Sequence, residues 1–106
     1  MLFDSIENND NEISGITISA DSLIIAITKW DGMPVNIVCT GYYGHKAFLP
    51  IGVDIGNVIL KEDSSFMSEL DLSDEESKKL RSLSFYSAWD DDQLLIEVVA
   101  KNFELR

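Results

Sequence analysis

The sequence predicts an α+β domain, with an antiparallel β-sheet of about five to seven hairpin-connected strands and one short helix. Two observations carry this prediction. Runs rich in β-branched and aromatic residues recur between short turn-forming breaks, and a single segment has both the start and the end signals of a helix. The length of 106 residues suits one hydrophobic core, so residues 1–106 are treated as a single globular domain.

The first half of the chain predicts four strands. Residues 16–19 alternate isoleucine with Thr and Ser, a polar "ADS" break follows, and "LIIAITKW" at 23–30 is apolar on both faces, so these two segments should form a hairpin. The Asp-Gly pair after Trp30 is a favoured turn sequence. Strands at 35–42 and 55–61 complete this half, and the glycine-bracketed stretch between them should be a loop or a short edge hairpin.

One helix, residues 74–81, is predicted from local signals. Ser73 with Glu76 three residues later forms a capping-box pattern, while acidic residues occupy the first turn and basic residues the last. A helix this short depends on packing, here of Leu80 and Leu83, more than on helix propensity.

The last third of the chain predicts a long hairpin, with strands at 83–89 and 94–103 around a "DDDQ" break. A helix over 94–103 also fits the apolar spacing, with Asp91 or Asp92 as its N-cap, but the β-branched cluster favours a strand. One face of that strand is apolar. The other is mixed and is expected to be partly exposed; it carries Leu95, Glu97, Val99, Lys101 and Phe103.

Residues 1–12 are acidic and rich in asparagine, with large apolar residues near the start, so they should form either a frayed leader or a short docked turn. No signal peptide or membrane span is expected, because the longest apolar run, residues 23–27, is too short and the first residues carry no base. Cys39 is the only cysteine, so no intrachain disulfide is expected and the reducing cytoplasm is the expected compartment.

Charge is the strongest global feature of the sequence. The 19 acidic and 8 basic residues give a formal net charge of −11. Nucleic acids and anionic membrane surfaces are not expected as partners, because both repel such a chain. The charge either serves solubility alone or complements a basic protein partner and raises the rate of association.

A Trp-Asp pair occurs twice, in "ITKWDGMPVNIV" at 27–38 and in "SAWDDDQLLIEV" at 87–98. The echo predicts two hairpin turns of similar build, since the chain is too short for the blades of a propeller repeat. We expect Trp30 and Trp89 to pack over strand ends and close the core. The alternative is an aromatic contact surface made of Trp30, Trp89, Tyr42, Tyr43 and Tyr86.

Chemistry-bearing side chains concentrate in "GYYGHK" at 41–46, which brings two phenols, the only imidazole and a lysine to one stretch. His45 has no obvious orienting partner nearby in the sequence, so a polar surface role is favoured over catalysis. Cys39 lies within an apolar strand and is expected to be a buried small hydrophobe, not a nucleophile. No catalytic residue is assigned.

Neither a metal ion nor a cofactor is expected. One cysteine and one histidine are too few for a zinc site, and the acidic runs "SDEE" and "WDDD" lack the spacing and the glycine of a calcium loop. The segment "GVDIGN" lacks the lysine and the spacing of a phosphate-binding loop. A helix cap and a solvated turn explain the acidic runs.

Three functional hypotheses follow. The first is a non-catalytic acidic module that binds a basic protein, as an immunity protein or an inhibitor does, by analogy of size and charge only. The second is a structural or assembly subunit that forms a homodimer through an edge strand or the mixed face of residues 95–103. The third is a small-molecule binder or enzyme centred on Tyr42, Tyr43 and His45. For the first hypothesis, the predicted partner-binding residues are Asp74, Glu75, Glu76, Trp89, Asp91, Tyr42 and Tyr43.

Overall fold

The computed structural model describes residues 3, 6, 7, 10–48, 51–62, 64–70, 72–90 and 92–106, and of Ser77 it describes the backbone alone. This part of the chain holds eight strands and two short helices. Their bounds, in chain order, are β1 Glu12–Ile18, β2 Ser22–Thr28, β3 Pro34–Thr40, β4 Gly44–Ala47, β5 Ile55–Lys61, α1 Ser65–Glu69, α2 Asp74–Lys79, β6 Arg81–Ser87, β7 Leu94–Ala100 and β8 Asn102–Leu105.

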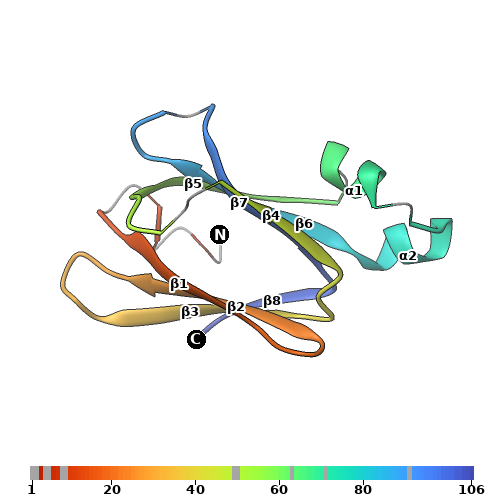
Figure 1. Ribbon diagram of the computed structural model, residues 1–106, viewed down its shortest axis with the longest axis horizontal. Coiled ribbons are helices and arrows are strands. Elements are labelled where there is room, and N and C mark those ends of the chain that lie inside the picture. The colour runs from red at the N-terminus through yellow and green to blue at the C-terminus, as the bar shows by residue number, and fades with distance from the viewer. Residues whose placement is uncertain are drawn as a thin grey trace.

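The described strands form two antiparallel, four-stranded sheets around one main core. The first sheet has the order β1-β2-β3-β8 and the second the order β4-β7-β6-β5 (Figure 1). The predicted α+β class with hairpin-connected antiparallel strands is confirmed. Its strands are divided between two sheets, and α1 is a helix that the sequence analysis did not predict.

The two sheets share a corner, because two long arms of the chain pass from one sheet into the other. β3 continues into β4 through residues 41–43, and β7 continues into β8 through Lys101. The arms pair on both sides of the corner, β3 with β8 and β4 with β7. Gly41 has a φ of +66° at this bend, where a residue with a side chain would be strained, so glycine permits the sharp turn.

At the opposite edges of the sheets, β1 and β5 approach each other where both begin. Isolated bridges join Glu12 to Asp54 and Ile13 to Ile51. The Ile55 amide also donates to the Asn11 carbonyl at 2.8 Å. The two sheets are therefore linked by backbone contacts on both sides of the core.

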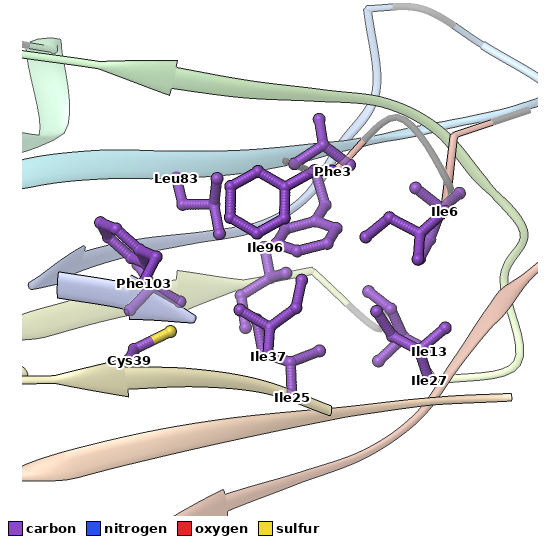
Figure 2. Close-up of a cluster of buried hydrophobic side chains, with 14 of the residues drawn as sticks. Phe3, Ile6, Ile13, Ile25, Ile27, Ile37, Cys39, Leu83, Ile96 and Phe103 are labelled. Atoms are coloured by element: carbon purple, nitrogen blue, oxygen red, sulfur yellow. The ribbon is translucent and has the colours of Figure 1, made fainter. Parts of the chain in front are cut away.

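The described part of the acidic leader is docked on the domain. Phe3 and Ile6 are 3% and 0% exposed and lie between the two sheets (Figure 2). The Glu7 carboxylate accepts a hydrogen bond from the Val58 amide at 2.9 Å, on the edge strand β5. This segment fills the core and occupies part of a strand edge that the sheet leaves unpaired.

Branched aliphatic side chains dominate the main core. Every second residue of β2 and β3 points inward, and Leu83 and Ile96 meet them from the second sheet (Figure 2). Burial raises the pKa of Cys39 to about 12, so its thiol stays protonated at neutral pH. The prediction of a buried, unreactive cysteine agrees with this position. The inward residues of β2 and β3 include Leu23, Ile25, Ile27, Ile37 and Cys39.

The strand predicted at 94–103 is present as two strands, β7 and β8, which Lys101 separates and which belong to different sheets, and the competing helix is wrong. The partly exposed mixed face is also wrong. Leu95 lies at a register shift between β6 and β7, and its side chain belongs to the main core. Glu97 and Val99 are buried on the outer face of the second sheet. Phe103 lies past the corner and joins the main core again. The face that was suggested for homodimer contact is thus largely covered by the chain itself.

Candidate functional site

The predicted partner-binding residues divide between two ends of the molecule. Asp74 is the first residue of α2, whereas Trp89 lies in the β6–β7 hairpin, at the end away from the helices (Figure 1). Asp91 lies outside the described residues. The structure brings four of the others together beside α2, in a groove of about 360 Å³ that includes Tyr42, Tyr43, Glu75 and Glu76.

This helix groove carries balanced charge. Two glutamates are accompanied by Lys79 from α2 and Lys101 from the corner, so acids and bases are equal in number along its lining. Tyr43 is the more open of its two phenols, with 43% of the side chain exposed. The groove therefore offers aromatic and mixed polar contacts without a net charge that would draw a basic ligand. Its lining is completed by Gly41, Ser73 and Leu80.

The capping box that the sequence predicted positions the acidic residues of the helix groove. The Ser73 hydroxyl accepts from the Glu76 amide, and the Glu76 carboxylate accepts from the Ser73 amide, each at 3.2 Å. One Glu76 oxygen is thus occupied by the helix start. The helix ends at Lys79, earlier than predicted, because the chain turns extended at Leu80 to enter β6.

A second hydrophobic cluster fixes both helices to the outer face of the second sheet. Phe66 and Met67 from α1 pack with Leu80 and with Val99 of β7. The Lys46 ammonium lies 5.0 Å from the centroid of the Phe66 ring, within the range of a cation–π interaction. Leu80 packs here as expected, whereas Leu83 belongs to the main core.

Glu97 is a buried carboxylate that ties this layer to the sheet. Its Oε2 accepts hydrogen bonds from Ser64 at 2.6 Å and from Ser82 at 2.5 Å. Ser64 is the N-cap of α1 and also accepts from the Met67 amide at 3.2 Å. A carboxylate with 6% exposure is tolerated because hydroxyl donors replace water around it. Its role is structural support of the helices that form the groove.

His45 has a partner that the sequence did not reveal. Its Nδ1 lies 2.6 Å from the Tyr42 hydroxyl, and the two rings are tilted with centroids 5.7 Å apart. Burial raises the pKa of Tyr42, so the phenol keeps its proton at neutral pH, and the tautomer of the imidazole decides which of the two groups donates. The pair holds Tyr42 at the wall of the helix groove.

Both tryptophans are exposed, which contradicts the predicted closure of the core. Trp30 and Trp89 have 70% and 82% of their side chains exposed. Each lies two residues past the end of a strand, on a turn, and Phe3 and Ile6 already fill the core (Figure 2). The indoles and the groove phenols lie at opposite ends, so the proposed single surface of five aromatic rings is wrong as well.

The two Trp-Asp turns are built alike, as predicted. The Asp31 carboxylate accepts from the Met33 amide at 3.1 Å, and the Asp90 carboxylate accepts from the Asp92 amide at 3.0 Å. In each turn the aspartate binds the amide two residues ahead, a local bond that favours turns. The tryptophan before each aspartate faces solvent.

We name the surface around these turns the tryptophan end. Besides Trp30 and Trp89 it includes three exposed apolar side chains, Met33, Phe48 and Ile51, with 60%, 54% and 54% exposure. Phe48 reaches this end because its amide donates to the Leu95 carbonyl near the start of β7, and Ile51 does so through its bridge to Ile13. The sequence does not reveal these three; its available signal, the Trp-Asp echo, predicts two similar hairpin turns and not the apolar side chains around them.

Within the described residues, no three side chains of histidine, cysteine, aspartate or glutamate converge in a way that could hold a metal ion. The described helices are also too short and polar to cross a lipid bilayer. Fold and surfaces together define a small two-sheet α+β domain with a charge-balanced groove at one end and exposed tryptophans at the other. Comparison of the chain with protein-family models, with curated proteins and with solved structures gave no match.

Proposed function

We propose that this chain is a non-catalytic acidic module that binds a basic protein partner. The observation that carries the proposal is the exposure of its carboxylates. Glu97 is buried, but most described acids lie at the surface of a chain whose formal net charge is −11. The exposed ones are Asp10, Asp21, Asp31, Glu62, Glu69, Asp74, Glu75, Glu76, Asp90, Asp92 and Glu104.

Such a surface favours a basic protein over other partners. Exposed negative charge raises the rate at which a positively charged protein approaches, and it repels nucleic acid and anionic lipid. Exposed aromatic side chains supply the anchoring contacts that charge alone does not provide, because tryptophan and tyrosine are common anchors of protein interfaces. Trp30, Trp89 and Tyr43 meet that requirement here.

The expected setting is the reducing cytoplasm, where a lone thiol stays unpaired. An immunity protein or an inhibitor has the same general chemistry, and the proposal extends that far by analogy of size and charge. The Tyr42–His45 pair is assigned a positioning role at the groove wall, supported by its hydrogen bond of 2.6 Å.

The proposal is tested by the salt dependence of binding. The immobilised chain is exposed to cytoplasmic lysate, a retained protein is identified and purified, and its affinity is measured at about 50 mM and about 500 mM NaCl. We expect a basic protein whose affinity falls by at least about tenfold over that range, since screening weakens attraction between exposed charges. Retention of an acidic protein, or affinity that salt leaves unchanged, would contradict the proposal.

A further inference from the structure

The tryptophan end holds both tryptophans of the chain on a firm backbone. The Asn11 side chain accepts from the Trp30 amide at 3.0 Å, and the Asn11 carbonyl accepts from the Ile55 amide at 2.8 Å. Asp54, the residue before Ile55, accepts at its carbonyl from the amide of Ala88 at 3.0 Å, and Ala88 is the residue before Trp89. Hydrogen bonds through residues 11, 54 and 55 therefore tie the two hairpins together, so the backbone that carries both tryptophans is in place before any partner binds.

Carboxylates follow both tryptophans directly in the sequence. Asp31 follows Trp30, Asp90 follows Trp89, and Asp10 precedes the bridging asparagine, all three with exposed side chains. Each turn aspartate uses Oδ1 for its own turn, which restrains its carboxylate on the residue after the tryptophan. The lining of the helix groove has as many bases as acids. At the tryptophan end, the described turn residues include the base Lys29 together with the acids Asp10, Asp31 and Asp90.

Exposed indole faces, each with a turn-bound carboxylate on the next residue, suit one cationic group in particular. A guanidinium is planar, stacks on an indole face and donates two parallel hydrogen bonds to a carboxylate. An ammonium is a compact point charge with a tightly held hydration shell, and it gains less from the same arrangement. The adjacent apolar side chains, Met33, Phe48 and Ile51, would cover the methylene stem of a long cationic residue or a neighbouring apolar residue.

We propose that the tryptophan end is the docking surface, and that it takes an arginine-bearing segment of the basic partner. This inference rests on the proposed function, because it assumes that the partner is a basic protein. A second copy of this chain is a poor occupant, since two such ends would bring like charges together. Arginine side chains stack on Trp30 and Trp89 and pair with Asp31 and Asp90.

The first test uses defined probes, octa-arginine and octa-lysine peptides, with the intact ¹⁵N-labelled chain at low salt. Two tryptophans give two indole N–H signals, which the Trp30→Phe variant assigns. We expect octa-arginine to shift both indole signals, and to bind roughly tenfold more tightly than octa-lysine. Equal affinity for the two peptides would overturn the assignment to arginine.

The second test uses variants, with binding followed by calorimetry. The Trp30→Ala, Trp89→Ala double variant should weaken octa-arginine binding by about tenfold or more, because hot-spot aromatic residues carry most of an interface's affinity. Ile18→Ala removes an exposed apolar side chain at the far end of β1, outside both proposed surfaces, and serves as the control, with unchanged affinity. Circular dichroism checks that the variants fold, which is expected because all three side chains are exposed.

The outcomes separate the two levels of the proposal. Octa-arginine binding that shifts residues of α2, leaves the indole signals unmoved and survives the double variant would place docking at the helix groove; the inference would then fail while the proposed function stands. Failure of both peptides to bind at low salt would remove the support for the proposed function as well.

Discussion

At the scale of single residues, the buried carboxylate of Glu97 decides how the helices attach to the sheet. Its two hydroxyl partners come from different elements, Ser64 at the start of α1 and Ser82 in β6. Removing one partner leaves a charged group with fewer donors in a site that water does not reach, and that loss exceeds the net value of a neutral hydrogen bond.

We expect Ser82→Ala to lower the free energy of unfolding by about 2 kcal/mol, the usual range for a hydrogen bond to a charged group. The matched control is Ser87→Ala, another buried serine, whose hydroxyl accepts from the Trp89 backbone amide and should contribute about 1 kcal/mol. Urea unfolding of both variants measures the difference. Equal costs would show that the Glu97 charge adds nothing to this bond.

Cys39 gives a pH dependence with a defined sign. Burial raises its pKa from 9.0 to about 12, so the folded chain keeps a proton that the unfolded chain releases above pH 9. The resulting stability is fully present below the unfolded pKa and is lost as pH rises toward the folded one, with a slope of at most about 1.4 kcal/mol per pH unit.

The measurement is urea unfolding of the wild type and of Cys39→Ala between about pH 8 and about pH 11. Because lysines and tyrosines titrate in the same range, the difference between the two proteins isolates the cysteine. The wild type should lose stability more steeply. Parallel curves would mean that the thiol ionises within the folded protein as easily as outside it.

At the scale of elements, the sequence predicted what local chemistry controls. The Asp-Gly turn after Trp30, the capping box of α2 and the strand 55–61 are all present, because turn residues, caps and β-branched runs act over a few residues. The helix α1 was missed because no acid lies in its first turn and no base in its last. Its support comes from the contact of Phe66 and Met67 with the sheet, which local sequence cannot show.

The candidate surfaces were predictable only in part, for a related reason. Tyr42 and Glu75 are distant in the sequence and meet because the corner of the two arms brings residues 41–43 under α2. The exposure of Trp30 and Trp89 was predicted wrongly, since an indole at a strand end packs inward only where the core has room. Here Phe3 and Ile6 occupy that room; the sequence allowed a docked turn in the first residues but did not show where it would pack.

Gly56 shows how closely two elements approach. A Cβ added there would lie 2.7 Å from the Ser87 carbonyl oxygen and 2.9 Å from the Ala88 Cα, both backbone atoms that cannot move aside cheaply. We expect Gly56→Ala to cost roughly 1–3 kcal/mol in unfolding free energy, as overpacking does. Gly15→Ala is the control, because its Cβ would lie 3.8 Å from Ala26 in ordinary contact. Similar urea midpoints for both variants would refute the expected clash.

At the scale of the whole molecule, a formal net charge of −11 works against the compact state. We expect the melting temperature to rise when NaCl is increased from about 20 mM to about 200 mM, by about 4 °C for each kcal/mol of repulsion that salt screens. The variant Asp21→Asn, Glu62→Gln, Glu69→Gln removes three exposed charges and should respond less. A wild-type melting temperature that falls or stays constant would argue against self-repulsion.

The homodimer hypothesis also concerns the whole molecule, and a measurement of molecular mass in solution distinguishes it from a monomeric binding module. A module that waits for a basic partner should remain a monomer of 11.9 kDa in light scattering at low salt, because like charges oppose self-association. Twice that mass, at concentrations near those of the binding experiments, would favour the assembly subunit. The described edge strands β1 and β5 would then be the first surfaces to test.

The position of β7 bears on how the chain folds. β7 lies inside the second sheet, between β4 and β6, yet it is among the last segments in chain order. β4 therefore cannot pair until β7, about half a chain length away in the sequence, has been made. Likewise, β3 cannot pair with β8 until the chain beyond β7 is present. Pairings this distant slow folding, and they leave the earlier hairpins exposed during synthesis. The surplus of acidic side chains would keep those incomplete chains apart.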